Sequence, residues 1–104
     1  MVRFPWQICP SYLKYDRHPL TIPRHCNKQL VQEGLDDDSV SIVTPHGTMS
    51  GHIYHGHCSW GPFYEVKTFG GYDGDPMTHF KRGERVVVEI ARVGEKVRVT
   101  IRYA

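Results

Sequence analysis

The sequence has few cysteines, and their number and spacing limit the kinds of site they could form. Cys9, Cys26 and Cys58 would leave one thiol unpaired in any disulfide scheme within a single chain. Their spacing also matches no zinc-ribbon or zinc-knuckle pattern. A reducing, intracellular setting, cytoplasmic or nuclear, is the simplest interpretation.

Long apolar runs are also missing. No stretch approaches the roughly 20 apolar residues that cross a bilayer as a helix. The segment Met1–Trp6 lacks the apolar run and small-residue cleavage site of a secretory signal. We therefore expect neither export by that route nor a membrane partner.

The positive and negative charges of the chain nearly balance. Its formal net charge is +2, so any attraction to nucleic acid must come from the local placement of basic residues. Paired carboxylates in a nuclease-like arrangement and a phosphate-binding loop are both absent from the sequence. We expect a protein that is not an enzyme and has no cofactor.

What is present indicates one β-rich domain spanning residues 1–104. A chain of 104 residues can form one hydrophobic core but not two. Ten glycines and seven prolines suit many turns between short strands. The expected fold class is therefore mainly β.

The first half of the chain predicts an edge strand and a short helix. Val2–Ile8 includes Pro5, which favours an edge strand or an extended arm over a central strand. Arg24–Glu33 has the apolar spacing of a helix that would end at Gly34. Three side chains would share one face of this helix: Cys26, Leu30 and Val31.

The middle of the chain predicts strands separated by loops. Val40–Val43 and a return strand as far as Tyr54 would flank the turn Thr44–Gly47. The segments His55–Gly61 and Gly70–Pro76 are expected to be loops, with a strand at Phe63–Phe69 between them. The acidic run Asp36, Asp37 and Asp38 is expected to be a solvated loop with no chemical role.

The C-terminal segment predicts a long hairpin that turns at Gly94-Glu95, since Gly suits the first central position of a type II′ turn. This register places Glu89 opposite Thr100 and diagonal to Arg98 and Arg102 on the outer face. The inward side chains would be Val86, Val88, Ile90, Val97, Val99, Ile101 and Tyr103.

The order of these elements is similar to that of B3-type DNA-binding pseudobarrels. Leu20–Arg24 resembles the opening of plant B3 and restriction-enzyme effector domains, and also that of swapped-hairpin transcription factors. The whole arm, strand and helix unit would be Lys14–Leu30, and Val40–Tyr54 is similar to the family's strand, turn and strand. Lys81–Val88 is similar to its closing strand.

This resemblance implies an open, seven-stranded pseudobarrel with one or two short helices. Such a domain binds double-stranded DNA sequence-specifically in the major groove through two loop arms, in transcription regulation or restriction-modification. The first arm would be Lys14–His18, including Asp16, and the second His55–Trp60. The residues expected to contact DNA are Lys14, Tyr15, Arg17, His18, Arg24, Lys28, His55, His57, Ser59 and Trp60.

The expected contacts differ in kind. Three side chains could read base edges: Arg17, His57 and Ser59. Three others could neutralise phosphates: Lys14, Arg24 and Lys28. Trp60 would either stack or wedge at the tip of its loop, or act as a lid on the end of the barrel.

The chain also departs from the family pattern. Gly71-Tyr72 stands where Gly-Trp is usual, and Glu84 stands where Asp is common. Asp73–Pro76 replaces the helix that usually follows and is not expected to continue as a helix.

Two other hypotheses use different residues. A metal-binding protein or a metal-dependent enzyme could use a site built on His52, His55, His57 and Cys58, with a further ligand from His46, His79, Cys9 or Cys26. His57 and Cys58 would point to opposite faces of an extended segment, so they would not form a catalytic pair. A protein-interaction module or inhibitor could instead use exposed Trp60, Phe63 and Tyr72 as anchors.

Overall fold

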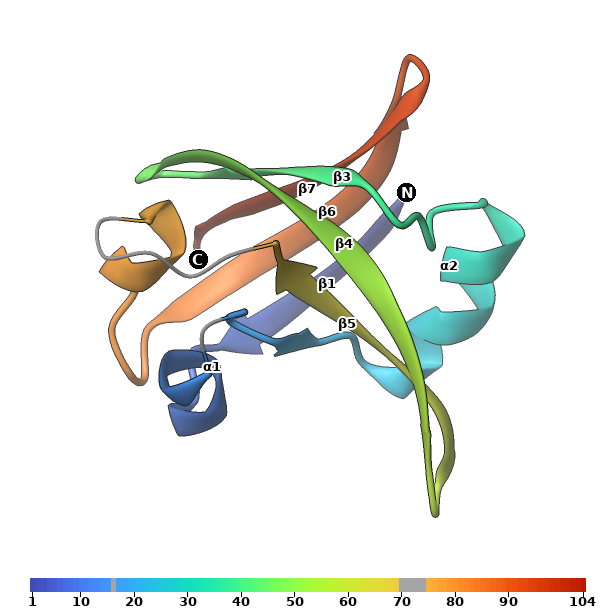
Figure 1. Cartoon of the computed structure of the whole chain (residues 1–104), viewed down its shortest axis with the longest axis horizontal. Coiled ribbons are helices and arrows are strands. Elements are labelled where there is room, and N and C mark those ends of the chain that lie inside the picture. Colours follow the sequence, from blue (N-terminus) through green and yellow to red (C-terminus); the bar gives the residue numbers. More distant parts are fainter. Residues whose placement is uncertain (16, 70–74) are drawn as a thin grey trace.

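A single sheet of seven strands, curled into an open half-barrel, makes up most of the structure (Figure 1). The computed structural model describes residues 1–15, 17–69 and 75–104. The strands are β1 Val2–Gln7, β2 Leu20–Thr21, β3 Val40–Thr44, β4 Gly47–Cys58, β5 Gly61–Thr68, β6 Arg85–Val93 and β7 Lys96–Tyr103. The helical segments are α1 Pro10–Lys14, η1 Arg24–Cys26, α2 Asn27–Gln32 and η2 Pro76–His79. The expected mainly β fold, with an open seven-stranded sheet and short helices, is confirmed.

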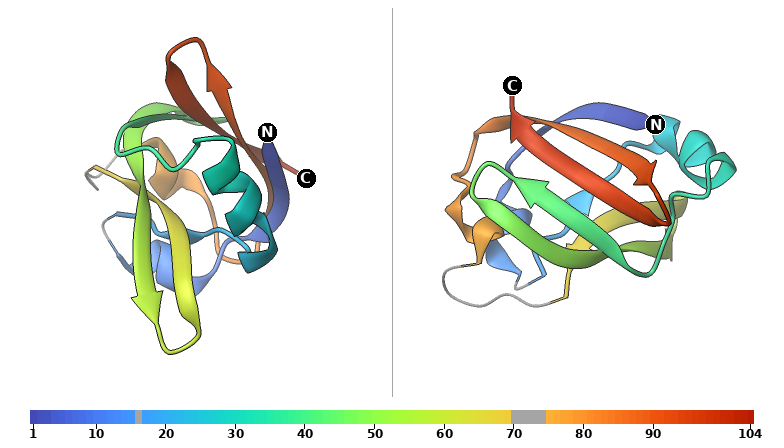
Figure 2. Two further views of the ribbon diagram at one scale, coloured as in Figure 1. Left: turned by 90° about the vertical axis from the view of Figure 1, so that its right-hand side faces the viewer. Right: turned by 90° about the horizontal axis from the view of Figure 1, so that it is seen from above.

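The strands lie in the order β1-β6-β7-β3-β4-β5-β2, and neighbours are antiparallel except for β3 and β7. In Figure 2, β7 (red) runs beside β3 (green) across the sheet. β1 lies at one edge, as Pro5 predicts, and pairs with β6. No helix of the described residues is long and apolar enough to span a membrane.

The C-terminal hairpin has the predicted register. Glu89 pairs with Thr100, and Val93 pairs with Lys96 across the turn. Gly94 has a φ of 65°, as the first central residue of a type II′ turn requires. On the outer face, Glu89 forms ion pairs with Arg102 and, at 3.9 Å, with Arg3 of β1.

The inward faces of β6 and β7 contribute to the core, with one exception. The predicted inward residues that are at most 1% exposed are Val86, Val88, Ile90, Val97, Val99 and Ile101. The prediction for Tyr103 was wrong, because this side chain is 42% exposed. Here β7 runs past the end of the core, and the Tyr103 hydroxyl instead lies 2.6 Å from His46 Nε2.

The helix between β2 and β3 begins with a 3₁₀ turn and ends at Gly34, which has a φ of 65°. Cys26 and Leu30 are buried as predicted, but Val31 is 47% exposed, so its expected place on the same face was wrong. Successive residues of a helix are about 100° apart, so the residue after Leu30 turns away from the core.

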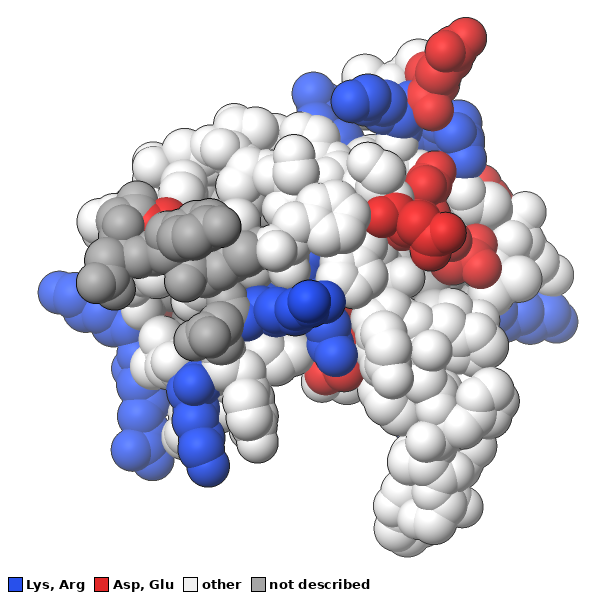
Figure 3. Space-filling view, in the orientation of Figure 1, with Lys and Arg blue, Asp and Glu red and all other residues white. Residues whose placement is uncertain are grey.

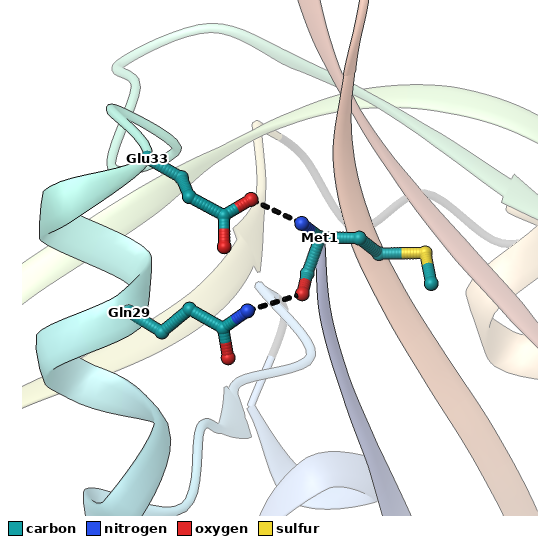
Figure 4. A network of polar contacts seen from close by, with 3 residues as sticks. All are labelled: Met1, Gln29 and Glu33. Atoms are coloured by element: carbon teal, nitrogen blue, oxygen red, sulfur yellow. Dashed lines mark hydrogen bonds and ion pairs between the residues drawn. The ribbon is translucent and has the colours of Figure 1, made fainter.

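Helix α2 also contacts the start of β1. Gln29 Nε2 donates a hydrogen bond to the Met1 carbonyl at 2.6 Å, and the Glu33 carboxylate pairs with the Met1 amino group (Figure 4). The helix is thereby attached to the edge strand at one end of the half-barrel.

Two expected loops contain regular structure. His55–Gly61 is not a loop, because β4 continues to Cys58 and pairs there with Gly61. The second prediction fails at Pro76, where η2 begins: the Asp75 carboxylate accepts a hydrogen bond from Met77 N at 2.8 Å, and proline suits a first helical position. Residues 70–74 of that predicted loop, including Tyr72, lie outside the described residues. Asp36–Asp38 is outside any helix or strand, as predicted.

Gly51 marks a close approach between β4 and its two neighbours. A Cβ atom at this position would lie 2.4 Å from the Lys67 carbonyl oxygen and 2.5 Å from Ile42 Cδ1. The first contact is with backbone, so the strands themselves would have to move.

We predict that Gly51→Ala lowers the free energy of unfolding by about 1–3 kcal/mol, the usual cost of forcing extra atoms into a packed site. Urea unfolding would measure it, with the adjacent and exposed Ser50→Ala as the control. A stability within about 0.5 kcal/mol of the wild type would contradict this packing.

Candidate functional site

The hairpin formed by β4 and β5 projects beyond the core (Figure 1). Ile53 and Val66 are 4% and 0% exposed, whereas His55, His57 and the turn residues are exposed. This projection, residues 55–63, is here called the ribbon arm. It carries the expected second arm, although as a paired strand hairpin.

Trp60 occupies the end of the ribbon arm with Ser59. It is 77% exposed, so the hypothesis that it closes the end of the barrel was wrong. The indole is instead presented to solvent at the point farthest from the core, as the tip hypothesis requires.

The ribbon arm and the whole of strand β4 carry no formally charged side chain. No Lys, Arg, Asp or Glu occurs between Thr44 and Tyr64, a segment that holds His46, His52, His55 and His57. In Figure 3 the arm is the uncharged projection at the lower right. Its polar chemistry therefore comes from imidazoles, hydroxyls, the Cys58 thiol and backbone groups.

The tip of the arm is supported from η1 and α2. Arg24 Nη2 donates a hydrogen bond to the Trp60 carbonyl, and Asn27 Nδ2 donates one to the Pro62 carbonyl at 3.5 Å. Arg24 was expected to neutralise a phosphate. The structure places its guanidinium against the backbone of the tip, while Lys28 is exposed on α2.

The histidines of β4 are divided between two faces by the strand alternation. His55 and His57 lie on one face with their ring centroids 5.0 Å apart. His52 and Cys58 lie on the other face. As predicted, His57 and Cys58 therefore point apart. Among the described residues no group of three potential metal ligands comes together.

The expected first arm, Lys14–His18, begins at the last residue of α1. Tyr12 is fully buried, and its hydroxyl donates a hydrogen bond to the Met77 carbonyl at 3.0 Å. Burial and the Asp75 carboxylate raise the pKa of Tyr12 above its ordinary value. Lys14 and Tyr15 are exposed, with Lys14 Nζ 5.7 Å from the centre of the Tyr15 ring.

Within this arm the structure contradicts one expected surface position. His18 is only 5% exposed and packs on Tyr12 with ring centroids 5.2 Å apart. The chain returns to the sheet here, so the ring faces the core. Arg17 remains exposed, and Asp16 lies outside the described residues. The exposed part of this segment, Lys14, Tyr15 and Arg17, is here called the basic arm.

Strand β5 connects the two arms. Its Thr68 N–H donates to the Arg17 carbonyl at 2.9 Å, and its other end enters the ribbon arm. The eight residues of β5 span roughly 26 Å at about 3.3 Å each. A depression of about 470 Å³ lies beside the basic arm, lined by Tyr15, Arg17, Pro19, Glu65 and Lys67.

Sequence reasoning missed the part that Lys67 plays in this surface. Lys67 Nζ lies 3.8 Å above the Tyr54 ring and 3.8 Å from a Glu65 carboxylate oxygen. The alternation of Phe63, Glu65 and Lys67 was a usable signal, because it places all three on the outer face of β5. Acidic residues gather elsewhere, over the loop before β3 (Figure 3).

His52 lies on the same outer face, where burial and the charged side chains around it shift its pKa. Burial lowers the pKa of His52, and Arg17 and Lys67 lower it further, against a smaller opposing effect of Asp38. The proton is therefore bound less tightly in the folded chain than in the unfolded chain.

We predict that this histidine contributes to acid destabilisation. The pKa of His52 in the folded protein lies below the ordinary value of 6.5, so as the pH drops the unfolded chain takes up this proton first. The free energy of unfolding should therefore fall as the pH drops through 6.5 toward the folded pKa. Urea unfolding from about pH 8 to about pH 5 should show a shallower loss for His52→Gln than for the wild type. His25→Gln, at an exposed position in η1, is the control. Equal slopes for the wild type and His52→Gln would contradict the assignment.

No family model matches the chain, and no curated protein matches it either. The function must therefore be inferred from the arrangement of the two arms and the surface between them.

Proposed function

We propose that this chain binds double-stranded DNA sequence-specifically, with the ribbon arm and the basic arm both contacting the major groove. The observation that carries the proposal is the projecting, uncharged ribbon arm at one end of β5, with basic side chains at the other end. Strand β5 would lie along the duplex between them.

The shape of the ribbon arm supports this proposal. A major groove about 12 Å wide admits a two-stranded β-ribbon. The arm has no carboxylate to repel phosphates, and it presents imidazoles at His55 and His57 and a hydroxyl at Ser59. These groups can donate to or accept from base edges, and the exposed Trp60 ring can make apolar or stacking contacts.

The distribution of charge supports it as well. Arg17 of the basic arm and Lys67 of β5 line the depression, and Lys14 Nζ lies 5.7 Å from the ring of Tyr15, another lining residue. Phosphate contacts from about three such cations would give a slope of log K against log salt of roughly −2.7. A slope this small is consistent with a net charge of only +2.

A protein partner is the second candidate, and the exposure of Trp60 favours it. An indole that is 77% exposed is the kind of anchor on which protein interfaces depend. Phe63 is half-buried, so among the described aromatics of this hypothesis Trp60 is the exposed one. Binding through such an anchor would depend on salt much less than binding to phosphates.

The test is selection from a randomised duplex pool at two salt concentrations, using the wild type and the variants Arg17→Ala, His57→Ala and Arg98→Ala. The wild type should enrich a short motif. Arg17→Ala should weaken binding and reduce the salt slope by about 0.9, whereas His57→Ala should cost about 1–3 kcal/mol at one position of the motif. Arg98→Ala removes the same charge from β7 and should change neither.

Failure to enrich any motif, with no binding even at low salt, would overturn the proposal and favour a protein partner. Equal losses in Arg17→Ala and Arg98→Ala would also contradict it, because they would indicate general electrostatic attraction and not the two arms.

A further inference from the structure

His55 and His57 lie on one face of the ribbon arm in an arrangement suited to chelation. Their ring centroids are 5.0 Å apart and the ring planes are tilted by 41°. Both side chains are exposed, so an ion from solution can reach them. We propose that this pair binds one borderline divalent transition-metal ion, such as Cu²⁺, Ni²⁺ or Zn²⁺.

The separation of the rings agrees with the geometry of such a site. A metal–nitrogen bond of about 2.0–2.1 Å places each ring centroid roughly 3.2 Å from the ion. Two imidazoles bound at right-angled or tetrahedral positions then have centroids about 4.5–5.2 Å apart. The observed 5.0 Å falls in this range, so the separation of the rings is compatible with both binding one ion.

The position of one ligand is fixed by its neighbour across the strands. His55 pairs with Tyr64, and the two rings are stacked at 4.5 Å with an angle of 12°. Tyr64 is itself 7% exposed and belongs to the core. The stacking therefore holds the His55 ring in place, which reduces the entropy lost when an ion binds.

In a second histidine pair, one ring nitrogen already has a hydrogen-bond partner. His46 and His79 have ring centroids 5.4 Å apart, but His46 Nε2 lies 2.6 Å from the Tyr103 hydroxyl. This contact occupies one nitrogen of that pair. His46 and His79 thus provide an internal comparison on the same chain.

The proposed site has open coordination positions. Among the described residues no third His, Cys, Asp or Glu joins the pair, so water or an added ligand would complete the shell. Imidazole nitrogens favour transition metals over Mg²⁺ and Ca²⁺, which prefer oxygen ligands. The inference is independent of the proposed DNA binding, since it requires only the two imidazoles.

The test is isothermal titration of Ni²⁺ into the untagged chain without DNA, at a pH of about 7.5, where imidazoles are mostly neutral. We expect one ion per chain, with the affinity reduced at least about tenfold in His55→Gln and in His57→Gln. His79→Gln and Cys58→Ser should bind as the wild type does, and Mg²⁺ should not bind.

A wild type without detectable Ni²⁺ binding would overturn the proposal. A Ni²⁺ affinity equal to that of the wild type in either histidine variant would do the same. Loss of binding in Cys58→Ser would also overturn it, because it would assign the ion to the thiol. A measurement on the wild type needs no variant to fold: Cu²⁺ at less than one equivalent should broaden the proton resonances of His55, His57 and Tyr64 before those of His46 and His79. Broadening that begins at His46 and His79 would contradict the site.

Discussion

The parallel pairing of β3 with β7 is the contact on which the rest of the structure depends. It joins the antiparallel unit β1-β6-β7 to the antiparallel unit β3-β4-β5-β2. The paired residues Val40 with Val97 and Ile42 with Val99 are each at most 3% exposed. It is the strand pairing that connects the two units in the described sheet. A parallel pairing needs a long connection, so it cannot form locally. Since β3 also pairs with β4, the same framework determines which side chains of β4 face inward. Ile53, His55 and His57 lie on that inner face.

Strand β5 holds the basic arm and the ribbon arm at its two ends. It pairs with β2 near the basic arm and with β4 along the ribbon arm. The spacing of the arms is therefore set by backbone hydrogen bonds, which are stiffer than the side chains they present. Contacts from Arg24 and Asn27 to the backbone of the arm add support near its tip. A preorganised arm loses less conformational entropy on binding than a flexible loop would.

The sequence predicted those parts of the fold that local chemistry determines. The C-terminal hairpin followed from apolar alternation and from Gly94, and the end of α2 followed from Gly34. The helix α1 has a local signal as well, because proline stands at its first position. These features need no knowledge of distant partners, so they can be inferred from a single chain.

The remaining features depend on contacts between distant segments. His55–Gly61 contains Gly, His and Cys, which do not favour strands by themselves, and it is extended because it pairs with residues that continue into the core strand β5. His18 is buried because the chain turns back onto Tyr12. Tyr103 is exposed because β7 extends beyond the end of the core. The candidate site was therefore predicted as two separate segments. Alternation along β5 indicates which face Lys67 occupies, but its place beside Arg17 and the separation of the arms depend on the order of the strands.

The most direct test of the account is to map DNA contacts residue by residue in solution. Amide resonances of the ¹⁵N-labelled chain would be followed during titration with the duplex obtained by selection. Binding through two arms predicts shifts confined to the basic arm, the ribbon arm and the outer face of β5, with Asp36–Asp38 and the β6–β7 turn unchanged. Shifts centred on the β6–β7 hairpin, or spread evenly over the surface, would contradict it.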